Sequence, residues 1–321
     1  MPAAVGRPLR HRVLPTAAVS VVVRTAEPAE LDAVLLKMFE LAGVADPAGG
    51  LDSLRAAERD GKLNLDTVLV AEKGEAVAGV QLCVLPGDGS ALVWVPEAAS
   101  EAVRQRLMRA AVRMLDGAGV RFSQVLRPPG HASAGFLNEA GFAKTTELIS
   151  FVASPPFAGG RCDEGVPFSD ADAEAWGATL AATYEGSLDC PEANGVRTGA
   201  EAVESHRAAA GGDTGLWRRF LIDGRPAGLL LANAEPAFGS TEIAYLGVVP
   251  GCRGRGLGRR MLKGLLGRLP PSAASVFVTC DARNTPAVRL YESLGFAAEA
   301  RQELWLRFGV ESGPPKRTNR F

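Results

Sequence analysis

The sequence predicts an α/β protein with a mixed sheet, organised as two similar halves. Its 321 residues are enough for two compact domains of ordinary size. Apolar residues recur with the period of strands or of helices, and the same order of elements occurs twice. With 47% hydrophobic and 22% charged residues, the chain also has the apolar content that two buried cores require.

In the first half, β-branched runs predict strands, and apolar residues at helical spacing predict helices. The clearest helix carries Leu107 and Met114 on one side. The expected strands are 19–24, 67–72, 76–84, 91–95, 122–126 and 145–152, the last of which closes this half. The expected helices are 28–42, 98–116 and 132–140.

The second half begins with a helix that is capped by the segment 169–172 and ends near Thr183. A hairpin turn is expected at Asp223-Gly224. The nearly all-apolar segment 241–249 predicts a central strand covered on both faces. The strands are expected at 216–222, 226–233, 241–249, 276–280 and 299–308, and two further helices at 256–269 and 285–294.

The two halves can be aligned without a gap at one constant shift of 154 positions, as from Pro96 to Pro250. The other aligned pairs are Leu107 with Met261, Phe136 with Leu290, and Gly141-Phe142 with Gly295-Phe296. Four pairs in register favour duplication over the chance similarity of two α/β domains. Prolines and glycines then indicate a linker. The expected division is a tail 1–18, a first domain 19–153, a linker 154–165, a second domain 166–310 and a tail 311–321.

Charge and cysteine content argue against several classes of function. The 35 basic and 36 acidic residues nearly balance, so neither nucleic acid nor an anionic membrane is an expected partner. No apolar run reaches the roughly 20 residues that span a bilayer, and residues 1–18 are interpreted as a tail rather than a signal peptide. Five scattered cysteines and three histidines favour neither a disulfide framework nor a metal site, and fit a reducing, cytoplasmic setting.

The segment 249–258 says most about chemistry, because a buried strand runs there into a glycine-rich turn and a helix start. Free N–H groups and the helix dipole make such a turn an anion site. Its glycines at 254, 256 and 258 admit a bulky diphosphate close to the backbone. The turn lacks the patterns of a P-loop and of a dinucleotide-binding fold. Positive charge around it comes from Arg253, Arg255, Arg259 and Arg260.

Two segments resemble the GNAT acetyltransferases. Residues 249–258 are similar to the acetyl-CoA pyrophosphate loop of that family, whose core is Arg/Gln-x-x-Gly-x-Gly/Ala. Residues 284–296 match the family signature Asn-x-x-Ala-x-x-Leu-Tyr-x-x-x-Gly-Phe position for position. The clear resemblance covers about residues 216–308. Residues 19–152 are connected to the family only through their similarity to the second half. The resemblance implies two tandem GNAT folds, of which only the second is equipped to use acetyl-CoA as co-substrate and an amine as acceptor.

The resemblance further implies a sheet that splays open between the strands at 241–249 and 276–280. The pantetheine arm of acetyl-CoA would lie in the gap, bonded to backbone groups of 246–248. Asn284 would contact the pantetheine, although it can equally be a plain helix N-cap. The residues implied to bind the cofactor are Leu246, Gly247, Val248, Arg253, Gly254, Arg255, Gly256, Leu257, Gly258 and Asn284.

Acyl transfer to an amine needs a base for the amine and an acid for the departing thiolate. The resemblance places Tyr291 beside the CoA sulfur as the acid, and the alternative is a buried core aromatic. Glu242 corresponds to a glutamate that acts as general base in the histone-acetylating branch, and the alternative is a solvated carboxylate at a strand end. Both residues are therefore candidate catalytic groups.

Tyr184, Glu185 and Asp189 follow the first helix of the second half, where GNAT proteins build the acceptor wall. They are expected to hold a cationic amine, and the alternative is a polar capping loop. Cys190 has no histidine nearby in sequence to activate it, so it is interpreted as a packing residue.

The first half lacks these features at the aligned positions. The stretch 99–102 replaces Arg253–Gly256, and the further replacements are Arg104 for Gly258, Gly130 for Asn284 and Leu137 for Tyr291. A degenerate first copy and one acetyl-CoA per chain are therefore expected. The expected function is acetyl-CoA-dependent N-acetyl transfer to a small-molecule or peptide amine, without a metal. The alternative is a non-catalytic acyl-CoA-binding or scaffold protein.

Overall fold

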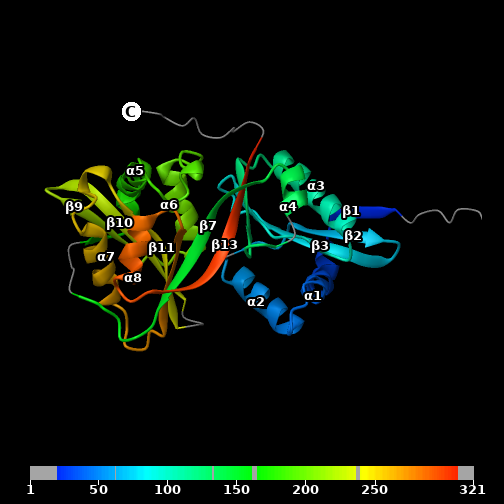
Figure 1. Cartoon of the computed structure of the whole chain (residues 1–321), viewed down its shortest axis with the longest axis horizontal. Coiled ribbons are helices and arrows are strands. Elements are labelled where there is room, and N and C mark those ends of the chain that lie inside the picture. Colours follow the sequence, from blue (N-terminus) through cyan, green and yellow to red (C-terminus); the bar gives the residue numbers. More distant parts are fainter. Residues whose placement is uncertain (1–19, 62, 132–133, 161–164, 236–238, 310–321) are drawn as a thin grey trace, which may run out of the picture.

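The computed structural model describes residues 20–61, 63–131, 134–160, 165–235 and 239–309. The expected tails, 1–18 and 311–321, lie outside these residues. The described strands form one mixed sheet in the order β1-β2-β3-β4-β6-β13-β7-β12-β11-β10-β9-β8, with β5 paired to β3. Helices cover both faces of this sheet (Figure 1). None of the helices in the described part of the chain is long and apolar enough to cross a membrane.

The elements of the first half follow the expected order. Its strands are β1 (Val21–Thr25), β2 (Val68–Lys73), β3 (Ala76–Val84), β4 (Ser90–Val93), β5 (Glu97–Ala98), β6 (Phe122–Arg127) and β7 (Ala143–Ala153). Its helices are η1 (Pro28–Glu30), α1 (Leu31–Leu41), α2 (Pro47–Arg59), α3 (Glu101–Gly117) and α4 (Ala134–Glu139).

The elements of the second half follow a similar order. The strands are β8 (Gly165–Pro167), β9 (Arg218–Ile222), β10 (Arg225–Glu235), β11 (Ser240–Val248), β12 (Ser275–Asp281) and β13 (Ala297–Phe308). The helices are η2 (Asp170–Asp172), α5 (Ala173–Tyr184), η3 (Pro191–Ala193), α6 (Gly199–Ala209), η5 (Pro250–Cys252), α7 (Leu257–Leu266) and α8 (Thr285–Glu292).

Four apolar clusters hold the helices on the sheet, one for each face of each half. In the first half, α1 and α2 cover one face and α3 and α4 the other. In the second half, Trp176 of α5 and Val203 of α6 pack on one face, while Met261 of α7 and Tyr291 of α8 pack on the other. The central strands of each half are therefore buried on both faces, which explains their nearly continuous apolar sequence.

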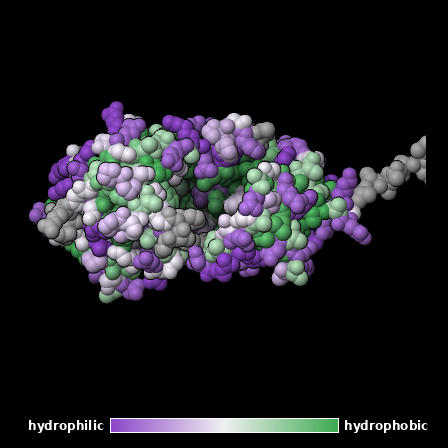
Figure 2. Space-filling view, turned by 90° about the horizontal axis from the view of Figure 1, so that it is seen from below, coloured by the Kyte–Doolittle hydropathy of each residue, from purple (hydrophilic) through white to green (hydrophobic). Residues whose placement is uncertain are grey.

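The halves exchange their last strands. The segment 145–152 was expected to close the first half, but β7 pairs with β12 and β13 of the second. In return, β13 pairs with β6 of the first half. The two long strands run side by side through the middle of the molecule, and the surface is hollowed between the halves (Figures 1 and 2). The expected boundary at 153 therefore does not coincide with a break in the sheet.

The helices α2 and α6 were not predicted from the sequence, and the helix cap predicted at 169–172 was wrong. Asp46 caps α2 by accepting from the Gly49 N–H, and Thr198 opens α6 with a full capping box. The segment 169–172 forms the short helix η2 before α5, and the caps of both elements lack side-chain hydrogen bonds. The missed helices have only one and two buried residues, so their periodicity is weak.

The constant shift of 154 positions between the halves holds at the segment 284–296 but not at the segment 249–258. Gly141 and Gly295 have nearly equal positive φ angles, +85° and +86°, and end equivalent helices. In contrast, the strand of the first half ends at Ala98 and α3 begins at Glu101, whereas β11 ends at Val248 and α7 begins at Leu257. The replacement of Arg253–Gly256 by 99–102 is thus wrong, because the first half lacks the whole turn.

Candidate active site

A cleft of about 590 Å³ opens where β11 and β12 separate. The two strands pair in parallel only from Ser240 with Ser275 to Ile243 with Val278. At that point the register of β10 with β11 skips Ala244, which forms a β-bulge. The bulge bends β11 away from β12, so the predicted splay between these strands has a local cause.

Backbone groups of β11 form one wall of the cleft. The N–H of Val249 bonds the carbonyl of Ala227 on the β10 side. Because successive residues of a strand turn their N–H and C=O groups to opposite sides, those of Leu246 and Val248 face the cleft. The predicted backbone wall at 246–248 therefore lines the cleft as expected, with Gly247 between them.

The glycine-rich turn closes one end of the cleft. Gly254 and Gly256 have φ angles of +70° and +76°, and a Cβ at either position would meet no atom within 4 Å. Gly256 is the N-cap of α7, so the first N–H groups of this helix are directed toward the turn. The open space, the left-handed backbone and the positive helix end fit a diphosphate. Leu257 and Gly258 also line the cleft.

Arg253 has a different role from the one its charge suggested. Its guanidinium donates to three backbone carbonyls, those of Val248 (2.9 Å), Gly186 (3.0 Å) and Thr183 (2.9 Å). These bonds tie the turn to β11 and to the C-terminal end of α5. Arg255 is not among the described residues that line the cleft. An anion at this turn would therefore be held mainly by backbone N–H groups rather than by these two arginines.

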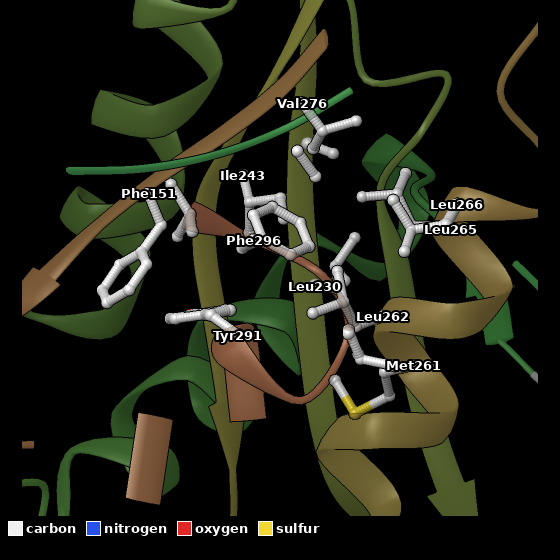
Figure 3. Packing of buried hydrophobic residues seen from close by; sticks show 14 of the residues in the cluster. Phe151, Leu230, Ile243, Met261, Leu262, Leu265, Leu266, Val276, Tyr291 and Phe296 are labelled. Atoms are coloured by element: carbon white, nitrogen blue, oxygen red, sulfur yellow. The ribbon is translucent and has the colours of Figure 1, made fainter. Parts of the chain in front are cut away.

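Tyr291 also lines the cleft and is only 4% exposed. Its ring packs against Phe151 and Phe296, both with centroids 5.8 Å away (Figure 3). Burial raises the pKa of Tyr291 well above its usual value, and the nearby Cys280 and Asp189 raise it further. The hydroxyl is therefore protonated at neutral pH, as a proton donor must be.

Glu242 lies beside the cleft rather than in it. It is paired across the sheet with Asn233, whose side-chain amide donates to it over 3.4 Å, and Asn233 in turn accepts from Trp217. Glu242 is not among the described residues that line the cleft. Of the two candidate catalytic residues, Tyr291 alone is among the described residues that line the cleft.

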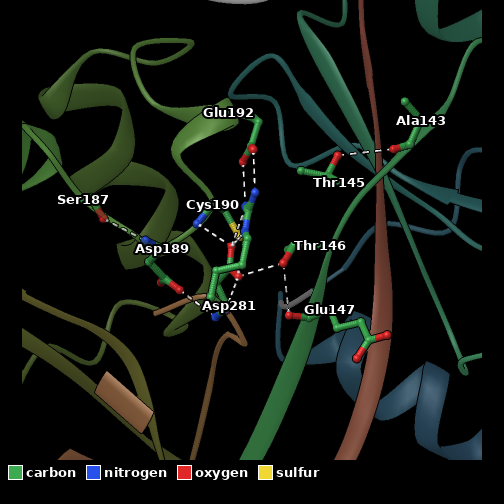
Figure 4. A network of polar contacts seen from close by, with 10 residues as sticks. Ala143, Thr145, Thr146, Glu147, Ser187, Asp189, Cys190, Glu192 and Asp281 are labelled. Atoms are coloured by element: carbon green, nitrogen blue, oxygen red, sulfur yellow. Dashed lines mark hydrogen bonds and ion pairs between the residues drawn. The ribbon is translucent and has the colours of Figure 1, made fainter. Parts of the chain in front are cut away.

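The loop after α5 reaches the cleft through one of its three predicted acceptor residues. Asp189 lines the cleft, whereas Glu185 is exposed and Tyr184 packs edge-on against Tyr245. Asp189 accepts from the Asp281 N–H over 2.7 Å, and Asp281 accepts from the Cys190 N–H (Figure 4). The loop is therefore fixed to the end of β12.

Asp281 is the centre of this polar network. It accepts from Thr146 of β7 over 2.7 Å and from Arg283, which also holds Glu192. Burial alone would raise the pKa of Asp281, but hydrogen bonds from Arg283 and Thr146 hold it below its usual value. Asn284 caps α8 by accepting from the Ala287 N–H, and it also lines the cleft. Its two suggested roles are thus compatible.

Several cleft residues were not predicted. Tyr245 lines the cleft, and its hydroxyl bonds that of Thr183 over 2.7 Å. Its exposure to the cleft follows from the bulge at Ala244, and no sequence motif predicts this bulge. Burial raises the pKa of Cys280 to about 12, so this cleft thiol is not a nucleophile at neutral pH. Among the described residues, no cluster of His, Cys, Asp and Glu is placed to hold a metal ion.

Residues 181–296 match the model of the acetyltransferase (GNAT) family. Over 99 residues the chain is 38% identical to a mycothiol acetyltransferase of Acidothermus cellulolyticus, a match that covers 29% of each protein. The chain thus aligns with less than a third of the length of that relative.

Two solved structures superpose on most of the chain. A GCN5-related N-acetyltransferase from Sphaerobacter thermophilus superposes with a TM-score of 0.60 at 19% identity, over 90% of this chain and 97% of that one. A tandem GNAT protein from the clavulanic acid biosynthesis pathway superposes with a TM-score of 0.52 at 16% identity, over 92% and 99%. The fold is that of the GCN5-related N-acetyltransferases. The sequence match supports the GNAT acetyltransferase family for residues 181–296.

Proposed function

We propose that the protein is an acetyl-CoA-dependent N-acetyltransferase whose single cofactor site lies in the second half. The observation that carries the proposal is the continuous cleft from the turn at Gly254 and Gly256 to the buried hydroxyl of Tyr291. Diphosphate would bind the N–H groups of the turn, and pantetheine would bond the backbone of Leu246 and Val248. The thioester would then lie near Tyr291, which protonates the departing thiolate.

The acceptor in this proposal is the amine of a small molecule or a peptide. The carboxylate of Asp189 and the ring of Tyr245 line the cleft, and together they would favour a cationic amine. We also propose that the first half is a degenerate GNAT copy, because its direct strand-to-helix connection at 99–100 has no room for a diphosphate turn.

Release of free CoA from acetyl-CoA, measured over a panel of amines, tests the proposal. We expect amine-dependent release by the wild-type protein and its loss in Tyr291→Phe. Tight acetyl-CoA binding without release for any amine would instead support the non-catalytic acyl-CoA-binding alternative.

A further inference from the structure

We infer that Asp189 is the general base that takes the proton from the amine acceptor. The inference rests on the proposed function and names the partner of Tyr291 in that reaction. It differs from the expectation for this fold, in which the strand glutamate Glu242 would have this role.

The first argument is position. Asp189 lines the same cleft as Tyr291 and Cys280, and its charge raises the pKa of both groups. Glu242 is not among the described residues that line this cleft, and it is bonded to Asn233. Of the two carboxylates, Asp189 is thus the one next to the proposed thioester position.

The second argument is orientation. One carboxylate oxygen of Asp189 accepts from the Asp281 N–H over 2.7 Å, and the Asp189 N–H is held by Ser187 over 3.1 Å. Asn284 also bonds the carboxylate. A carboxylate has about four acceptor sites, so two donors fix its direction and leave sites for an ammonium group.

The third argument is basicity. Burial raises the pKa of Asp189 above its usual value, and the charge of Asp281 adds to this effect, against the hydrogen bond from the Asp281 N–H. Asp281 itself stays ionised because Arg283 and Thr146 bond it. A base of raised pKa accepts a proton more readily at neutral pH. The titratable and charged groups facing Asp189 are Cys190, Tyr245, Cys280, Asp281, Arg283 and Tyr291.

The transfer of protons in the reaction assigns a role to Asp189 and to Tyr291. The acceptor ammonium gives one proton to Asp189, and the neutral amine attacks the thioester carbon. The C–N bond forms and the C–S bond breaks, while Tyr291 gives its proton to the CoA thiolate. The second proton of the amine nitrogen returns to the Tyr291 oxygen, and Asp189 then releases its proton to water. The net products are amide, CoA and one proton.

Steady-state kinetics of Asp189→Asn with an alkyl amine and with an aromatic amine test the inference. The alkyl amine is protonated at pH 7, whereas the aromatic amine is neutral and needs no base. With the alkyl amine we expect kcat to fall by about 10²–10⁴-fold with unchanged acetyl-CoA affinity. With the aromatic amine we expect at least a tenfold smaller loss. The acidic limb of the pH profile should disappear, because a carboxylate base is lost as pH falls through its pKa.

Three variants complete the experiment. Asp189→Glu keeps a carboxylate and should retain part of the activity with a shifted acidic limb, which guards against misfolding of the amide variant. Glu192→Gln weakens the Arg283 contact without touching the cleft and should cost less than about threefold. Three outcomes would overturn the inference. Asp189→Asn could raise only the acceptor KM, or it could lower kcat equally with both amines. The acidic limb could also disappear in Glu242→Gln rather than in Asp189→Asn. A wild-type protein without amine-dependent CoA release would refute the proposed function itself.

Discussion

The ring of Phe151 packs against the ring of Tyr291, with 5.8 Å between the centroids and 44° between the planes. Phe151 lies on β7, the strand that the first half contributes to the sheet of the second. Tyr291 lies on α8 and lines the cleft. The first half therefore forms part of the wall behind the proposed acid, which gives it a place in the site although it lacks the glycine-rich turn.

Replacing Phe151 tests this contribution. We expect Phe151→Leu to lower kcat by about tenfold and to leave acetyl-CoA affinity unchanged, because a smaller side chain lets the Tyr291 ring move. Phe142→Leu is the matched control, since Phe142 is equally buried but packs in the core of the first half. Equal losses of kcat in the two variants would show a general effect of destabilisation.

Tyr291→Phe removes the proposed acid and keeps the packing. Turnover should fall by about 10²–10⁴-fold, the usual contribution of a positioned acid, while acetyl-CoA affinity changes little. Because burial raises the pKa of Tyr291, the hydroxyl stays protonated through the alkaline range, so the loss should be similar at pH 7 and pH 9. Full activity of this variant would exclude Tyr291 as the acid.

Gly256→Asp tests the anion site. A non-glycine residue is strained at a φ of +76°, and a carboxylate there would repel the diphosphate. Acetyl-CoA should bind at least about tenfold more weakly in a calorimetric titration, a loss of about 1.4 kcal/mol. Gly119→Asp introduces the same change at a φ of +68° after α3, far from the cleft in the sequence and in the fold, and should leave the affinity unaltered. Unaltered affinity in both variants would place the diphosphate elsewhere.

A buried ion pair fastens the exchanged strand β13 to the first half. Glu303 accepts from Arg127 (2.6 Å) and from Lys144 (2.8 Å), and Arg127 also lies over the Trp305 ring. Glu303→Gln removes a charged hydrogen-bond acceptor of the buried Arg127 and should lower the free energy of unfolding by about 1–3 kcal/mol. Urea unfolding measures this loss. Glu299→Gln, at an exposed position on the same strand, should have little effect.

The same carboxyl gives an acid-dependent contribution. Burial alone would raise the pKa of Glu303, but hydrogen bonds from Lys144, Arg127 and Trp305 lower it from 4.5 to about 2. A lowered pKa stabilises the fold above pH 4.5, and this stabilisation is lost as pH falls toward 2. The wild-type protein should therefore lose more stability than Glu303→Gln between these pH values. Parallel pH curves would contradict the assignment.

The sequence predicted the central elements well because their apolar patterns are long. The strand at 241–249, the helix at 256–269 and the splay next to them all have close counterparts in the structure. The exchange of β7 and β13 was not predictable in this way, since periodicity shows that a strand exists but not which strand it pairs with. The correct pairing depends on contacts such as that of Glu303 with Arg127.

At the site, residue type was a weaker guide than backbone geometry. Arg253 was expected to face an anion, but it bonds three carbonyls, because the end of α5 presents unpaired acceptors next to it. Tyr245 faces the cleft only because of the bulge at Ala244. The ungapped repeat misaligned the turn, since buried helix faces constrain register and loops do not.

A crystal structure of the protein with acetyl-CoA, together with a titration of the same sample, tests the central claim most directly. We expect one acetyl-CoA per chain, with its diphosphate on the N–H groups around Gly256 and its sulfur next to the Tyr291 hydroxyl. Two equivalents per chain, a ligand at residues 99–100, or a thioester remote from Tyr291 would contradict it.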